Sequence, residues 1–160
     1  TGTKKSTAPF ASHHNGGPRV NESHSATPLE PLMSDPYALH FLNDWATNLG
    51  GGHLDDLLAM YEDEAVLLPT FGSEILRGQE ALRGYFTALM ENPNLSVHVE
   101  DGQINQNAHD EHRVLSGDYE FSWGTDASDM THVRARYTFA VTLVDGKWVA
   151  STHHSSVRPA

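Results

Sequence analysis

The sequence predicts an α+β fold in which a curved antiparallel sheet wraps around N-terminal helices. Apolar residues first recur with a helical period and later alternate with polar residues, so helices are expected before strands. An Asp-Gly pair joins the last two alternating runs, which is typical of a β-hairpin. The 160 residues suffice for one such domain and are too few for two of ordinary size.

The N-terminal segment, residues 1–33, is expected to be a flexible tail or linker. It is rich in Thr, Ser, Gly, Pro, Asn and His and has neither a helical nor a strand period. Its Pro and Ser content resembles an inter-domain or post-transit linker. The domain is expected to span residues 34–160, with Asp35 as the N-cap of a helix that starts at Pro36.

Three helices are predicted. The first carries an apolar stripe and ends at three glycines; the stripe consists of Ala38, Phe41, Leu42, Trp45 and Leu49. A short second helix presents Leu54, Leu57, Leu58 and Tyr61 on one side. A strand over residues 65–70 follows, and a third helix over residues 79–90 buries Leu82, Phe86 and Leu89.

After Pro93 the period changes to two, which predicts strands around residues 97–99, 115–123, 133–143 and 148–156. The Asp145-Gly146 pair favours a two-residue type I′ turn and so sets which residues face each other. Without a bulge, Tyr137 faces His154 and Ala135 faces Ser156. His154 and Ser156 are then expected inside the sheet, with His153 and Ser155 outside. A bulge in the last strand would exchange the two pairs.

Composition excludes several classes of function. The chain has no cysteine, so a disulfide framework, a thiolate nucleophile and a cysteine zinc site are excluded. Its net charge of −11 makes nucleic acid a poor partner. No apolar run approaches the roughly 18 residues that cross a bilayer, so no membrane segment is expected.

Three short motifs together carry a resemblance to a known family. They are Leu67-Leu68-Pro69-Thr70, Ala135–Phe139 and His153-His154-Ser155-Ser156. With the Asp-Gly-Lys-Trp turn they resemble NTF2-like cone-shaped domains, in particular the calcium/calmodulin-dependent kinase II association-domain group. More narrowly they resemble the iota-class carbonic anhydrases, whose C-terminal signature is HHHSS. Thr152 stands where that signature has its first histidine.

The resemblance implies an enzyme, a carbonic anhydrase (a lyase) that hydrates CO2 to bicarbonate. It implies that Thr70 and Ser156 hold the reacting water, that His154 accepts its proton, and that Tyr85 binds bicarbonate or orients the water. An apolar wall around CO2 would consist of Tyr137, Phe139, Trp148 and Trp45.

No cofactor or metal is expected. Zinc is the less favoured alternative, because the histidines show no ligand spacing such as HxH or HExxH. The resemblance also implies a homodimer that pairs through the sheet. It leaves the compartment open among an algal plastid, a bacterial cytoplasm and a periplasm.

Two other functions stay open. One is an oligomerising association (hub) domain without catalysis, using the outward face of the last hairpin. The other is a small-molecule isomerase or cyclase, which needs a carboxylate base inside the cone. Asp118 and Glu120 alternate with the apolar residues of their strand and so are expected to face away, which leaves Asp44 as a weak candidate.

Overall fold

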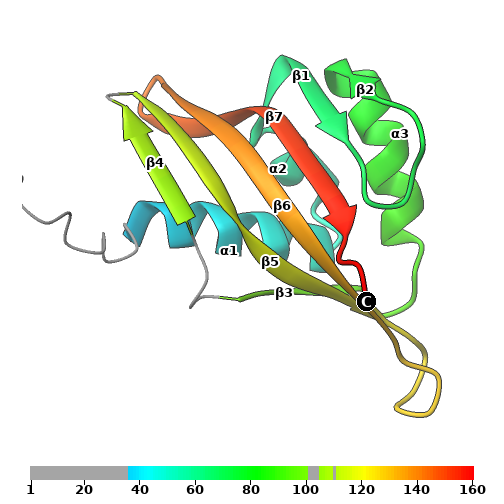
Figure 1. Cartoon of the computed structure of the whole chain (residues 1–160). Coiled ribbons are helices and arrows are strands. Elements are labelled where there is room, and N and C mark those ends of the chain that lie inside the picture. Colours follow the sequence, from blue (N-terminus) through cyan, green and yellow to red (C-terminus); the bar gives the residue numbers. More distant parts are fainter. Residues whose placement is uncertain (1–35, 101–104, 110) are drawn as a thin grey trace, which may run out of the picture.

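The computed structural model describes residues 36–100, 105–109 and 111–160. These residues form a curved sheet with helices packed against it, which confirms the predicted α+β class (Figure 1). The expected tail at residues 1–33 and the expected cap at Asp35 lie outside the described residues.

The three predicted helices are present as α1 (Pro36–Gly50), α2 (Leu54–Leu58) and α3 (Gly78–Met90). α1 lies across the sheet next to β3, and α3 lies beside one end of the sheet (Figure 1). The stripe on α1 is buried from Phe41 to Leu49, and α3 buries the three residues expected of it. In the described part of the chain, no helix is both long and apolar enough to span a membrane.

Seven described strands form one sheet in the order β2-β1-β7-β6-β5-β3, with β4 also paired to β5. Their bounds are β1 (Tyr61–Leu68), β2 (Leu76–Arg77), β3 (Ser96–Val99), β4 (Asn105–His109), β5 (His112–Trp123), β6 (Thr131–Val144) and β7 (Lys147–Val157). β2 and β4 were not predicted. β2 has only two residues, and the five residues of β4 are mostly polar, so neither shows an alternation of apolar and polar residues.

Two differences from the sequence prediction concern β1. It begins at Tyr61 rather than near residue 65, so Tyr61 lies on the sheet and not on the second helix. β1 also runs parallel to β7, and the sheet is therefore mixed. β1 and β7 are far apart in the sequence and no hairpin joins them, so no turn residue indicates their relative direction.

The last hairpin has the predicted turn but a different register. Asp145 and Gly146 have φ of 49° and 77°, as a type I′ turn requires. Pairing is regular from Val144–Lys147 to Val141–Ala150, and then Ala140 pairs with Thr152. Ser151 is therefore an extra residue in β7. This bulge shifts every later partner by one, so Tyr137 faces Ser155 and Phe139 faces His153.

The bulge overturns the predicted orientation of four residues. His153 and Ser155 lie inside, with exposed fractions of 2% and 5%. His154 is exposed and Ser156 is half-buried, so the expectation that these two face the interior is wrong. The physical reason is that an extra residue reverses the in-out alternation of everything beyond it.

Two glycine substitutions should change stability in opposite directions. A Cβ added at Gly84 on α3 or at Gly146 in the turn would meet no atom within 4 Å, so only backbone conformation differs. Gly84→Ala should raise the free energy of unfolding by about 0.5–1 kcal/mol, because Gly weakens a helix interior. Gly146→Ala should lower it by about 1 kcal/mol, because its φ is positive. Urea unfolding of both variants checks this, and equal signs would contradict it.

Candidate functional site

A buried polar network crosses the space between α1 and the sheet. His153 and Ser155, on the inner face of β7, are the polar residues among the described side chains that are fully buried. Their hydrogen-bond partners are Tyr61 on β1, Tyr119 on β5 and Thr70, two residues beyond the end of β1, and Trp45 on α1 joins the network through Tyr61. The network therefore joins distant parts of the sequence and exists only in the folded chain.

The inner half of the network links α1 to β7. The indole Nε1–H of Trp45 donates to the Tyr61 hydroxyl at 2.7 Å. The same hydroxyl lies 2.9 Å from Nδ1 of His153. The His153 ring stacks on Phe139 with centroids 3.7 Å apart and meets Trp45 edge-on. The imidazole is thus packed against the rings of Phe139 and Trp45.

The outer half leads from the imidazole to the end of β1. Nε2 of His153 lies 3.3 Å from the Tyr119 hydroxyl, which donates to Oγ of Ser155 at 2.5 Å. Oγ of Ser155 in turn shares a short hydrogen bond with Oγ1 of Thr70. Thr70 is half-buried, so the network runs from the core toward the surface.

Tyr85 on α3 adjoins this outer end. Burial raises its pKa to about 12, and backbone hydrogen bonds at Phe71 and Thr70 partly oppose that rise. Tyr85 also lies close enough to Tyr119 to raise the pKa of that phenol. The structure thus brings Thr70 and Tyr85 together as predicted, and places Ser155 beside them where Ser156 was expected.

Burial controls the protonation of the network. It lowers the pKa of His153 to about 3, with a smaller contribution from His154, so the imidazole is neutral at pH 7. It raises the pKa of Tyr61 and Tyr119 well above 10, so both phenols keep their protons. The buried network is therefore uncharged, and His153 is a poor resting base.

Two cavities lie at the outer end of the network; Thr70 lines the second, and its neighbour Phe71 lines the first. The first, the aromatic cavity, has a volume of about 330 Å³ and is lined by Phe71, Tyr85, Ala88, Leu89, Asn92 and Trp123. The second, the strand-end cavity, has a volume of about 430 Å³. Its wall contains Thr70, His154, Ser155 and Ser156, so three of the predicted catalytic residues do share one opening.

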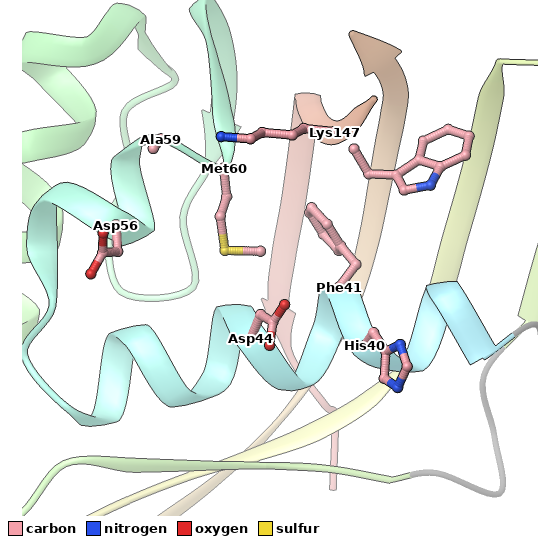
Figure 2. A pocket seen from close by; sticks show the side chains of 8 residues that line it. His40, Phe41, Asp44, Asp56, Ala59, Met60 and Lys147 are labelled. Atoms are coloured by element: carbon pink, nitrogen blue, oxygen red, sulfur yellow. The ribbon is translucent and has the colours of Figure 1, made fainter. Parts of the chain in front are cut away.

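A third cavity of about 310 Å³, the helix cavity, lies between α1, α2 and the start of β7. Figure 2 shows His40, Phe41 and Asp44 on α1 and Asp56 on α2, with Lys147 reaching across from β7. Asp44, the one weak candidate for an inward acid, is exposed and belongs to this cavity. It is not in the polar network.

The residues predicted to form a wall around CO2 do not line the cavities beside Thr70. Trp45 and Phe139 pack directly on His153, and Tyr137 packs against Tyr119 in the core. Trp148 lines the helix cavity, where Arg113 lies 5.0 Å above its ring. The aromatic cavity takes its apolar lining instead from Phe71, Ala88, Leu89 and Trp123.

Sequence reasoning missed Tyr61 and Tyr119 as members of the network. Tyr61 was expected on a helix, and Tyr119 was taken as one apolar residue of an alternating strand. The alternation correctly places Tyr119 on the inner face. Tyr61 and Tyr119 could be recognised as partners of His153 only if it were known that β1 and β5 lie near β7 in the sheet.

The described residues bring no three His, Asp or Glu side chains together in a way that could hold a metal ion. A catalytic zinc site uses three protein ligands, often histidines or carboxylates. Residues 36–100, 105–109 and 111–160 therefore do not fit the zinc alternative.

Comparisons with known proteins place the chain within one fold group. A family model described as the SnoaL-like domain matches residues 42–151. A candidate calcium/calmodulin dependent protein kinase II association domain from Xanthomonas campestris is 27% identical, with TM-score 0.69, covering 81% of this chain and 91% of that one. No curated protein matches the chain.

More distant structures share the fold. An NTF2-like protein of unknown function from Pseudomonas putida is 15% identical, with TM-score 0.65, covering 76% of this chain and 84% of that one. A candidate scytalone dehydratase from Novosphingobium aromaticivorans is 12% identical, with TM-score 0.68, covering 78% and 83%. The expected NTF2-like fold is thereby confirmed, and it occurs in enzymes as well as in association domains.

Proposed function

The chain belongs to the SnoaL-like domain family, and from the polar network that its fold encloses we propose that it is a carbonic anhydrase. It would hydrate CO2 to bicarbonate with hydroxyl groups rather than a bound metal. Thr70, Ser155 and Tyr85 are the proposed catalytic residues. The resemblance of its motifs to iota-class carbonic anhydrases supports the same activity.

One observation carries the proposal: a continuous run of hydrogen bonds ends at two hydroxyls beside open cavities. Ser155 and Thr70 are linked to each other and, through Tyr119, to a buried neutral imidazole. Such hydroxyls are fixed by their partners rather than by bulk water. A preorganised group of this kind stabilises developing charge without reorganising during the reaction.

The surroundings suit a small apolar substrate. Phe71 and Trp123 present their rings beside Tyr85 in the aromatic cavity, and the two rings meet edge-on at 5.7 Å. CO2 carries no charge, so an apolar wall accepts it while excluding bulk water. The polar edge of the same cavity is supplied by Tyr85 and Asn92.

In the proposed reaction, the oxygen of a water molecule forms a bond to the carbon of CO2. One C=O π bond of CO2 becomes the lone pair of an oxyanion, and the water gives up one proton, so the products are bicarbonate and a proton. The hydroxyls hold the reacting oxygens. We place the proton acceptor at exposed His154, which lines the strand-end cavity together with Thr70.

The isomerase or cyclase function is compatible with the fold, but the described residues offer no buried carboxylate for it. Such enzymes use a carboxylate as the base beside the substrate. Within the described residues no Asp or Glu is buried. Asp118 and Glu120 face away from the core and pair with Arg158 and Arg134 instead.

A second candidate function is an association domain, favoured by the likeness to the Xanthomonas campestris protein. The outward face of the last hairpin carries Arg134, Arg136 and His154, all exposed. This face is where pairing through the sheet to form a homodimer would occur. Size measurement in solution would show whether the chain associates, whichever function holds.

Stopped-flow CO2 hydration by protein purified with chelator, with metal content measured on the same sample, tests the proposal. Activity above buffer without stoichiometric metal would support hydroxyl-based catalysis. Activity that appears only after zinc is restored would keep the reaction and overturn the mechanism. No activity in either state would leave the association domain as the better function.

Replacing Thr70 by valine should lower CO2 hydration about tenfold to a hundredfold. Valine keeps the shape of threonine but removes the hydroxyl that bonds Ser155 at the wall of the strand-end cavity. Thr138→Val on the exposed face of β6 makes the same chemical change away from the network and should leave the rate unchanged. The stopped-flow rates of both variants are to be compared, with circular dichroism confirming folding. Equal losses in the two variants would speak against a role for the Thr70 hydroxyl.

A further inference from the structure

The polar network starts at a group that can only donate. We propose that the indole N–H of Trp45 fixes the tautomer of His153, and that this tautomer makes Thr70 a hydrogen-bond donor toward whatever oxygen occupies the site. Trp45 is then a positioning residue, although it touches no substrate. The identity of the ligand as bicarbonate or CO2 rests on the proposed function, whereas the direction of donation does not.

The first step concerns Tyr61. Its hydroxyl oxygen accepts a hydrogen bond from the indole N–H of Trp45 at 2.7 Å, and an indole nitrogen can only donate. Tyr61 is buried and still has its own proton to donate. Among the described contacts, the acceptor within reach is Nδ1 of His153 at 2.9 Å. A buried hydroxyl proton without an acceptor is costly, so Nδ1 is expected to be unprotonated.

The second step concerns His153. Burial lowers its pKa to about 3, so the ring carries one proton at neutral pH. With Nδ1 accepting from Tyr61, that proton is on Nε2. Nε2–H then donates to the Tyr119 oxygen at 3.3 Å. The neutral ring therefore accepts a hydrogen bond at Nδ1 and donates one from Nε2.

The third step reaches the surface. Tyr119, having accepted from His153, donates to Ser155 at 2.5 Å. Ser155 then donates to Oγ1 of Thr70. The Thr70 hydroxyl also lies within hydrogen-bond reach of Tyr119, so the hydroxyls of Tyr119, Ser155 and Thr70 form a triangle. Without a ligand, the Thr70 hydroxyl can donate to the Tyr119 oxygen. Thr70 and Ser155 both border the strand-end cavity. Because Ser155 gives its proton to Thr70, the Thr70 proton is the one that can turn outward.

The tautomer decides what the site recognises. With the proton on Nδ1 instead, every hydroxyl would reverse, and Thr70 would accept a proton from its ligand. With the proton on Nε2, Thr70 donates, as Tyr85 with its raised pKa also does. Two neutral donors suit an oxygen that bears or develops negative charge, such as an oxyanion. The proton of the attacking water must then leave by another route than Thr70.

The nitrogen chemical shifts of His153 test the tautomer directly. Long-range proton–nitrogen correlation spectra of the full chain labelled with ¹⁵N, at pH 7 and without substrate, separate protonated from unprotonated ring nitrogens. The His153 signals are assigned by their loss in His153→Gln. We expect a protonated Nε2 and an unprotonated Nδ1. A wild-type protein with its proton on Nδ1 would overturn the proposal.

Trp45→Phe tests the origin of the tautomer. Without the indole N–H, the Tyr61 oxygen loses its donor and can accept from Nδ1–H, with the Tyr61 proton turned into the space that the indole leaves. A mixture of tautomers is therefore expected. CO2 hydration should fall about two- to tenfold, as the loss of one neutral hydrogen bond allows. Phe41→Leu is the matched control, because Phe41 packs edge-on against Phe139 in the same core and has no hydrogen-bonding group.

The outcomes separate the inference from the function. A tautomer that shifts in Trp45→Phe and not in Phe41→Leu supports the proposal, even in a protein that shows no CO2 hydration. A tautomer unchanged in Trp45→Phe, or changed equally in both variants, overturns it even in an active enzyme. Bicarbonate titration of the wild type, followed at the Tyr85 and Thr70 signals, then reports the ligand separately.

Discussion

Ser155→Ala is expected to abolish most CO2 hydration, lowering the rate about 10²- to 10³-fold while the fold survives. Ser155 accepts from Tyr119 and bonds to Thr70, so its removal takes away one of the two hydroxyls at the cavity and leaves only the direct approach of Tyr119 to Thr70. Losing one preorganised donor in an active site has an effect of this size. The side chain removed is small, so the cavity it leaves in the core is small as well.

Ser156→Ala provides the matched control one residue away. Ser156 is half-buried on the other face of β7, where its hydroxyl lies 3.4 Å from Arg136. Its removal should leave the stopped-flow rate within about twofold of the wild type, because its hydroxyl contacts Arg136 and, among the described contacts, none of the buried network. The reverse result, an inactive Ser156→Ala and an active Ser155→Ala, would mean that the bulge at Ser151 is absent in solution.

His153 is expected to make the protein lose stability as the pH falls below about 6.5. The pKa of His153 is about 3 in the folded state and near 6.5 in an unfolded chain. Between these values the unfolded state binds a proton that the folded state does not. The stabilising contribution of neutral His153 is therefore complete above pH 6.5 and is lost as the pH falls toward 3.

Urea unfolding at pH values from 7.5 to 4.5 measures this effect. The free energy of unfolding should fall by up to about 1.4 kcal/mol for each pH unit below 6.5 from this residue alone. His153→Gln, which keeps a donor and an acceptor but does not titrate, should lose that dependence. His154→Gln, on the exposed neighbour, should keep it. The same slope in wild type and His153→Gln would rule out a buried neutral imidazole.

The sequence by itself determined the main elements and their apolar faces. The stripe from Phe41 to Leu49 and the triplet on α3 are buried where their spacing predicts. The Asp145-Gly146 turn has its predicted positive φ values because few other residues tolerate them. These features depend on residues close in the chain, so local physics suffices to predict them.

The site was only partly predictable. The resemblance assigned Thr70 and Tyr85 to one site, and the structure does bring Tyr85 beside the backbone of Thr70. Tyr61 and Tyr119 could not be assigned to the site, since they reach His153 from β1 and β5. Their roles depend on which strands are neighbours, and short sequence patterns do not contain that information.

The choice between the two pairs of residues on β7 was made by the tertiary structure alone. Ser151 is extra in β7, which pairs with β6 on one side and with β1 on the other. β1 also shifts register against β7 between Tyr61 and Val66, opposite the same stretch of β7. A bulge bends its strand locally and increases its twist. No residue near Ser151 predicts this bulge, and the bulge is what turns His153 and Ser155 inward.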